Sequence, residues 1–242
     1  MTFAIIVENV SKKFKVYHDK GYTLKEKILF WKRNTYDVRE VLKNINFSIN
    51  KGEAVGIIGR NGSGKSTILK LLSRIIYPDK GKIKINGRVA CLIELGAGFH
   101  PDMSGRENIY INASIFGLTK KEIDSKLQQI IDFSELWDFI DNPVRTYSSG
   151  MYMRLAFAVA INVEADILLI DEILAVGDIK FRKKCFDKLK EIKKNGTTIV
   201  IVSHSLQQIE YLCDNAIWID RGEVKMIDSP QKVLVEYKKL MK

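Results

Sequence analysis

The sequence has no long hydrophobic run, few cysteines and no internal repeat. Its longest apolar segments, such as residues 155–161, are far shorter than the ~18 residues that a membrane-spanning helix needs, so we expect no membrane span. The N-terminus lacks the basic start and the small-residue cleavage site of a signal peptide, which favours a cytoplasmic location. The three cysteines, Cys91, Cys185 and Cys213, fit neither a disulfide framework nor a zinc pattern, so we expect buried or inert thiols.

Composition and charge narrow the class of protein further. The chain has 242 residues, of which 46% are hydrophobic, and can therefore bury one substantial core. Its net charge of +10 comes from lysines that are spread along the chain among acidic residues. A solvated basic surface explains this charge better than a nucleic-acid-binding patch does, and we expect no nucleic-acid partner.

The order of the apolar segments predicts an α/β fold interrupted by a helical insert. Short continuous or alternating apolar runs are typical of strands, and apolar residues at helical spacing indicate helices. Residues 108–160 show only the helical pattern, and residues 17–40 have the character of an insertion with a short amphipathic helix near residues 24–31. We expect strands at residues 5–10, 41–49, 53–58, 167–170, 197–202 and 216–219, an edge strand ending in a hairpin at 82–87, and further helices at 68–76, 180–193 and 230–242.

A glycine-rich phosphate loop occupies residues 59–67, GRNGSGKST, after a predicted strand and before a predicted helix. Its glycines let backbone N–H groups converge on phosphate oxygens, and the helix points its positive end at them. Lys65 supplies a charge for the β- and γ-phosphates, and the Ser66 hydroxyl is a ligand for Mg²⁺. The predicted nucleotide-binding residues are Gly59, Arg60, Asn61, Gly62, Ser63, Gly64, Lys65, Ser66 and Thr67.

Two further strands end in residues suited to a phosphate site. The run ILLIDE delivers Asp171 and Glu172 at the end of one strand, where Asp171 would hold the magnesium ion and Glu172 would orient or deprotonate the attacking water. The next strand, residues 197–202, leads to His204, which would reach the γ-phosphate from the same sheet edge.

A second loop suited to an anion precedes the apolar helix near residues 155–160. Ser148, Ser149 and Gly150 open this helix, whose N-terminal amides again suit a phosphate. The chain therefore has two loops that would face phosphates, although its sheet already has its own phosphate loop.

These residues resemble the ATP-binding subunits of ABC transporters over about residues 4–228. In that family a signature, commonly Leu-Ser-Gly-Gly-Gln, contacts the ATP that a second, head-to-tail subunit holds. Ser148 and Gly150 match the signature, whereas Tyr147, Ser149 and Met151 depart from it. The resemblance implies a phosphate-loop (RecA-like) α/β core with a mixed sheet, antiparallel edge strands and an inserted α-helical subdomain.

The resemblance also implies roles for single residues. Asp171 resembles the magnesium-associated aspartate, Glu172 the catalytic glutamate and His204 the switch histidine, while Lys65 completes the catalytic set. Asp178 resembles the aspartate of the loop that faces the partner subunit. Glu94 is the nearest candidate for the glutamine that usually stands where the sheet meets the helical insert, close to the metal.

An aromatic residue from the early strands stacks on adenine in this family. Tyr17 is the first choice for this role, and Phe14 and Tyr36 are the alternatives.

The segments YSSGM, DEILAVGD, ELGAGFHP and GREN resemble the ATPases of polysaccharide exporters, which export O-antigen, capsule or teichoic acid. This implies ATP and Mg²⁺ as cofactors, a homodimer of ATPase subunits, and two copies of a separate transmembrane permease that docks near residues 94–108. The protein would lie peripherally on the cytoplasmic face of the cell (inner) membrane, and the polymer would not contact the ATP site.

The expected organisation is a single ABC ATPase domain over residues 1–242. Its core comprises residues 1–94 and 161–228, its helical subdomain residues 95–160, and its C-terminal helix residues 229–242. An ABC ATPase for another exported substrate and a soluble ABC ATPase used in assembly or repair remain open. A kinase or GTPase is disfavoured, because the chain lacks an Asn-Lys-x-Asp motif and a monomer has no use for a second anion loop.

Overall fold

The computed structural model describes residues 2–17, 36–92, 95–171 and 177–240 of the chain. Its core is a six-stranded sheet in the order β5-β6-β7-β3-β8-β9, in which β9 alone runs antiparallel to its neighbour. The mixed sheet and antiparallel strands predicted from the sequence are confirmed. The strands of this sheet are β3 (Ala54–Ile58), β5 (Val89–Leu92), β6 (Ile167–Asp171), β7 (Thr198–Val202), β8 (Asn215–Asp220) and β9 (Glu223–Asp228).

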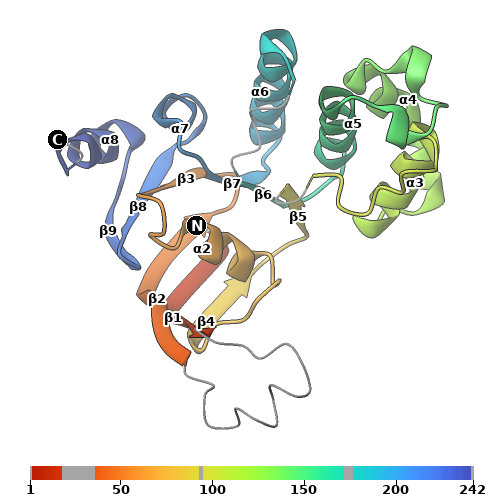
Figure 1. The fold of residues 1–242 in the computed structure, drawn as a ribbon. Coiled ribbons are helices and arrows are strands. Elements are labelled where there is room, and N and C mark those ends of the chain that lie inside the picture. The colour runs from red at the N-terminus through yellow and green to blue at the C-terminus, as the bar shows by residue number, and fades with distance from the viewer. Residues whose placement is uncertain (1, 18–35, 93–94, 172–176, 241–242) are drawn as a thin grey trace, which may run out of the picture.

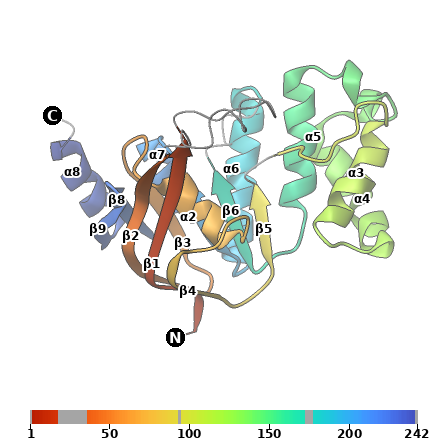
Figure 2. The same ribbon diagram turned by 60° about the horizontal axis from the view of Figure 1, so that its bottom comes forward.

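A second, antiparallel sheet has the order β2-β1-β4 and lies beside the first (Figures 1 and 2). Helix α2 (Lys65–Leu72) contributes buried residues to a core shared with both sheets. One face of the large sheet is thus covered by α2 and the small sheet. The strands of the small sheet are β1 (Phe3–Tyr17), β2 (Tyr36–Asn50) and β4 (Lys80–Ile85).

The other face of the large sheet is covered by helices α6 (Ile179–Lys194), α7 (Leu206–Leu212) and α8 (Pro230–Leu240). Helix α7 approaches β3 very closely, because Gly56 presents no side chain to it. A Cβ at Gly56 would lie 2.6 Å from Cγ2 of Ile209.

Helices α3 (Gly105–Ile115), α4 (Lys120–Ser134) and α5 (Ser149–Ile161) form a separate group beside β5 (Figure 1). Short 3-10 turns, Trp137–Phe139 and Val144–Thr146, join α4 to α5. Both α3 and α4 begin with a capping box, in which an N-cap hydroxyl and a glutamate three residues later satisfy each other's backbone amides. The last seven residues of α5 are all buried, as expected for a helix that is apolar on every side.

Several elements differ from the sequence prediction. The edge strand at residues 82–87 was expected to end in a hairpin, which is wrong: β4 stays in the small sheet and the next strand, β5, joins the large one. The chain crosses between the sheets at Gly87, where a Cβ would lie 2.6 Å from Cβ of Asp166, and the Arg88 amide donates to the Asp166 carboxylate at 2.7 Å. Strands β5 and β9 and helix α7 were not expected, and the helix expected near residues 24–31 lies outside the described residues.

The cysteines fit the expectation of inert thiols. Cys185 and Cys213 are buried and Cys91 is half-buried, and none of the three is in a disulfide. Burial raises the pKa of Cys91 to about 11 and that of Cys213 to about 12. Across the part of the chain that the structure describes, none of the helices has the length and apolar character required to span a membrane.

Candidate nucleotide-binding site

The phosphate loop joins the central strand β3 to helix α2. Strand β3 is fully buried and pairs with β7 on one side and β8 on the other, so the loop starts from a fixed point. Gly64 is the N-cap residue of α2, with φ of 108°, and within the described residues no side chain caps the helix. The first amides of α2 are therefore left to an anion.

Glycine is required in this loop for close packing at Gly59 and Gly64 and for a left-handed backbone at Gly62. A Cβ at Gly59 would overlap the Ile219 carbonyl oxygen, and a Cβ at Gly64 would lie 2.5 Å from Cδ2 of Leu42. At Gly62, where φ is 76°, a Cβ would meet no described atom within 4 Å. The loop is thus packed against β8 and β2, and its surface at Gly62 is open.

Lys65 is buried within the loop. Its ammonium group donates to the carbonyl oxygens of Gly59 at 2.9 Å and Arg60 at 3.0 Å. These bonds hold the side chain across the loop, which places its charge among the backbone amides. The Ser63 hydroxyl is also buried, and it has no hydrogen-bond partner among the described residues. The Lys65 charge suits an anion bound in the loop, whereas the Ser63 hydroxyl is enclosed by the loop itself.

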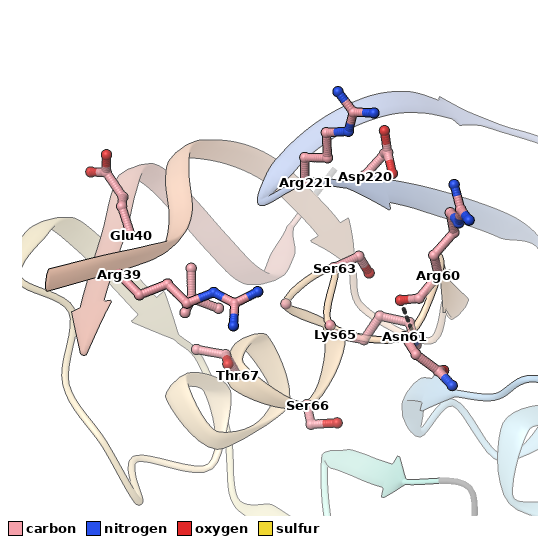
Figure 3. A pocket seen from close by; sticks show the side chains of 13 residues that line it. Arg39, Glu40, Arg60, Asn61, Ser63, Lys65, Ser66, Thr67, Asp220 and Arg221 are labelled. Carbon is pink, nitrogen blue, oxygen red and sulfur yellow. Dashed lines mark hydrogen bonds between the residues drawn. The ribbon is translucent and has the colours of Figure 1, made fainter. Parts of the chain in front are cut away.

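A cavity of about 650 Å³ opens over the phosphate loop. Besides the loop, β2 and the β8–β9 turn line it, and they bring Arg39 and Arg221 to it. Figure 3 shows the Arg39 guanidinium directed toward Thr67, whereas Glu40 points away. The sequence reasoning missed Arg39, Asp220 and Arg221, because only long-range strand pairing brings them to the loop. The cations around this cavity suit a polyphosphate.

Strand register places Asp171 in line with the phosphate-loop strand. Asp171 pairs with Val202, and Val202 pairs with Ile57, so the three residues share one rung at the carboxyl edge of the sheet. Side chains in one rung of a parallel sheet point to the same face, and Ile57 and Val202 pack in the core that contains α2. Asp171 therefore lies on the face where α2 begins with Lys65 and Ser66.

This arrangement fits a magnesium ion that is held partly by phosphate oxygens. No group of three His, Cys, Asp or Glu side chains forms a metal site within the described part of the chain. Mg²⁺ characteristically takes one or two protein oxygens and completes its shell with water and substrate phosphates. Ser66 and Asp171, a hydroxyl and a carboxylate, supply that kind of donor set.

His204 follows the neighbouring strand β7 at the carboxyl edge of the sheet and does not line the cavity over the phosphate loop. Together with Gly59 and Ser203 it lines a pocket of about 270 Å³. The Ser203 hydroxyl is buried, accepts from the Ser205 amide at 3.0 Å and donates to Gln208 at 2.8 Å. These bonds fix the turn after β7, so the structure brings His204 to the edge that the sequence predicted.

The second anion loop, residues 147–151, lies apart from the phosphate loop and is called the signature loop from here on. Ser148 is the N-cap residue of α5, and its hydroxyl accepts from the Met151 amide at 3.2 Å. Gly150 is in the first turn of that helix, and no signature-loop residue lines the cavity over the phosphate loop. Figure 1 shows α5 in the helical group, separated from α2 by strands of the large sheet.

Comparison with known proteins identifies the family. A family model described as ABC transporter matches residues 42–175. An O-antigen export system ATP-binding protein of Klebsiella pneumoniae is 46% identical over 96% of this chain and 96% of its own length. The chain belongs to the ABC transporter family. A relative of the same description from Myxococcus xanthus is 53% identical over 97% of this chain.

Other members of the ABC transporter family extend the comparison. A teichoic acids export ATP-binding protein of Bacillus cereus is 42% identical over the whole of this chain. This chain spans 55% of the Myxococcus relative's length and 44% of the Bacillus relative's length. A solved dimeric ATP-binding cassette in a post-hydrolysis state, bound to ADP and Pi, has a TM-score of 0.74 at 22% identity and covers 93% of this chain and 98% of its own. This likeness confirms the fold.

The signature loop of this ABC protein departs from the common signature at Tyr147, and the structure gives a reason. The Tyr147 hydroxyl donates to the Phe139 carbonyl oxygen at 2.7 Å and lies against Gly105, where a Cβ would overlap it. Burial raises the pKa of Tyr147 to about 12. The tyrosine therefore anchors the signature loop to the 3-10 turn at Trp137–Phe139 and to the start of α3.

Asp178, predicted to face the partner subunit, is the N-cap residue of α6. Its Oδ1 accepts from the Phe181 amide at 2.8 Å, and this hydrogen bond holds the pKa of Asp178 below its usual range. Its Oδ2 accepts from Arg154 of α5 at 2.7 Å. The carboxylate thus joins the start of α6 to the helix that follows the signature loop.

The aromatic candidates for adenine lie on opposite faces of the β1–β2 ribbon. Phe14 pairs directly with Arg39, which points toward the loop, so the two share a face. Tyr17 pairs with Tyr36, three residues further along, and the period of two puts both on the other face. None of the three aromatic residues lines the cavity, but Arg39 does. Tyr17, Phe14 and Tyr36 all stay predictions, and the register, which puts Phe14 on the face of Arg39, favours Phe14.

Two predicted site residues cannot be placed. Glu172, the proposed catalytic glutamate, and Glu94, the candidate metal-associated residue, lie outside the described residues. Their roles remain predictions from the sequence.

Proposed function

We propose that this chain is the ATP-binding and hydrolysing subunit of an ABC transporter that exports a lipid-linked polysaccharide, such as O-antigen, capsule or teichoic acid, across the cytoplasmic membrane. Relatives that are named for O-antigen export and for teichoic acids export support this substrate class, because both match nearly the whole chain. The protein acts as a peripheral subunit on the cytoplasmic face of that membrane, bound to a separate permease.

The nucleotide binds with its phosphates in the loop at residues 59–67. Lys65, the backbone amides of the loop and the first turn of α2 bind the phosphates and stabilise the charge that develops on the γ-phosphoryl group. Mg²⁺, held by Ser66 and Asp171, neutralises phosphate charge when bound. His204 orients the γ-phosphate from β7, and Glu172 orients and deprotonates the attacking water.

The observation that carries the proposal is the separation of the two anion loops within one chain. The signature loop presents a capped helix N-terminus that takes no part in lining the cavity over its own phosphate loop. A head-to-tail homodimer resolves this, since each Ser148–Gly150 loop then completes the ATP site of the other subunit. Two ATP molecules close the pair, and hydrolysis opens it.

Permease docking near residues 94–108 connects this opening to the membrane. The described part of that segment is fixed to the helical subdomain: the Tyr152 hydroxyl of α5 donates to Gly96 O at 2.8 Å. Buried Asn108 of α3 accepts from the His100 amide at 2.6 Å and donates to the His100 and Met103 carbonyl oxygens. A permease helix seated here would move with α5 and the signature loop.

The substitution Glu172→Gln tests this mechanism. The variant keeps the phosphate loop and should bind ATP as the parent does, but it loses the group that activates water. We expect its hydrolysis to fall by at least about a hundredfold, as for the loss of a general base. ATP should then trap it as a dimer that light scattering detects. Hydrolysis at the parent rate would contradict the role of Glu172, and a strictly monomeric ATP-bound variant would contradict the dimer.

A further inference from the structure

We propose that Arg154 is a positioning residue that fastens the signature-loop helix α5 to the start of α6, so that Ser148 and Asp178 meet the partner subunit as one unit. The proposal rests on the head-to-tail dimer described above. It concerns a side chain that touches neither the phosphate loop nor the cavity over it.

Arg154 makes three contacts with two other elements. Its guanidinium donates to the Asp178 carboxylate at 2.7 Å and to the Glu135 carboxylate at 3.2 Å. The guanidinium carbon also lies 4.8 Å from the centroid of the Phe181 ring. The Arg154 side chain is 20% exposed and Glu135 26%, whereas Asp178 is 60% exposed, so the contact with Glu135 is the more shielded of the two. A planar guanidinium can bridge two carboxylates and stack on a ring at once, which a lysine cannot do.

Both oxygens of Asp178 are occupied. One oxygen caps α6 through the Phe181 amide, and the other accepts from Arg154. The position of the Asp178 carboxylate is therefore set by α6 and α5 together. A rotation of α5 that moved the signature loop would pull on the same carboxylate.

Glu135 anchors the other side of Arg154. It is the C-cap residue of α4 in a left-handed conformation, with φ of 60°. Its second oxygen accepts from Lys184 of α6 at 2.9 Å, and Lys184 also donates to the Phe133 carbonyl oxygen at 2.9 Å. Arg154, Lys184, Glu135 and Asp178 thus form a chain of two cations and two anions across α4, α5 and α6.

In the dimer, the link through Arg154 makes the signature loop and the start of α6 move together. The signature loop and the loop before α6 come from different parts of the sequence, and both must reach the partner subunit for its site to close. A helix that can tilt relative to α6 would present one of them without the other. Arg154 couples their positions. The conformational entropy that is lost when the dimer closes is then smaller.

The experiment uses the Glu172→Gln protein, whose ATP-bound dimer accumulates, with Arg154→Met added. We expect the protein concentration for half-maximal dimer to rise by about fivefold or more, the effect of losing one partly exposed ion pair from each subunit. The affinity of the monomer for ATP should stay within about twofold, since Arg154 is remote from the phosphate loop. Arg154→Lys should restore dimerisation only in part.

Lys126→Met is the matched control. Lys126 is 21% exposed, close to the 20% of Arg154, and pairs with the more exposed Glu164 at 2.7 Å. Lys126→Met therefore removes an ion pair from α4 without touching Asp178. We expect it to dimerise as Glu172→Gln does. Glu135→Gln separates positioning from stability, because it weakens the network but leaves the Arg154–Asp178 bond.

The outcomes are distinct. Unchanged dimerisation of the Arg154→Met protein would overturn the inference and leave the proposed dimer standing. Equal losses in the Arg154→Met and Glu135→Gln proteins, in proportion to their falls in Tm, would overturn it in favour of a purely structural role. If the Glu172→Gln protein itself stayed monomeric with ATP, the dimer and this inference would fall together.

Discussion

Replacing Phe14 should weaken ATP binding, whereas replacing Tyr17 should not. Both rings are partly exposed, at 38% and 40%, so truncating either leaves the core intact. They differ in the face they occupy, because Phe14 is the cross-strand partner of Arg39 and Tyr17 is the partner of Tyr36. On the first face Arg39 lines the cavity over the phosphate loop, although the Phe14 ring itself does not.

The size of the effect follows from stacking. An aromatic ring under a base contributes about 1–3 kcal/mol in alanine substitutions, so Phe14→Ala should raise the Kd for ATP by about 5- to 150-fold. Tyr17→Ala should change it by less than about twofold. Inorganic triphosphate has no base to stack, and its affinity should be the same in both variants.

Equilibrium titration of the purified protein with ATP and with triphosphate measures both quantities. The reasoning is refuted if Tyr17→Ala weakens ATP binding as much as Phe14→Ala does. It is also refuted if Phe14→Ala weakens triphosphate binding to the same extent, because the substitution would then act on the phosphate loop and not on the base.

Two further predictions concern the partner and the packing. Tagged protein expressed in its own cells should copurify from a detergent extract with an integral membrane protein and a lipid-linked glycan, and a cytosolic scaffold in their place would contradict the export function. Gly56→Ala should lower the free energy of unfolding by about 1–3 kcal/mol through overpacking against Ile209, as urea titration would show. The cost should be smaller when added to Ile209→Ala, and strict additivity of the two would show that the contact is not the cause.

The positions of the phosphate loop, Asp171 and His204 at one edge of the sheet could be predicted, because each follows a strand that is recognisable from its own local sequence. The loop at residues 59–67 has its strand and helix directly beside it in sequence. Asp171 and His204 follow apolar runs that read as buried parallel strands, and parallel strands bring their carboxyl ends to one edge. The register confirms this convergence for Asp171 and β3.

Other features depend on pairing between distant residues, which a local pattern does not contain. Strand β5 has only four residues, and it belongs to the large sheet because it pairs with β6, from Val89 opposite Ile167 onward. Arg39 and Arg221 reach the cavity by the same kind of long-range pairing. The choice between Phe14 and Tyr17 depends on the β1–β2 register. The sequence does not predict this register, because the two strands are not joined by a short turn of recognisable type.

The position of β3 also bears on how the chain is made. The strand that carries the phosphate loop is complete at residue 58, but the two strands that flank it begin at residues 198 and 215. At the usual pace of translation, 5–20 residues per second, they leave the ribosome roughly seven to thirty seconds later. Until then both edges of β3 lack their hydrogen-bonding partners. The phosphate loop therefore cannot be fixed in the sheet until β7 and β8 have been synthesised.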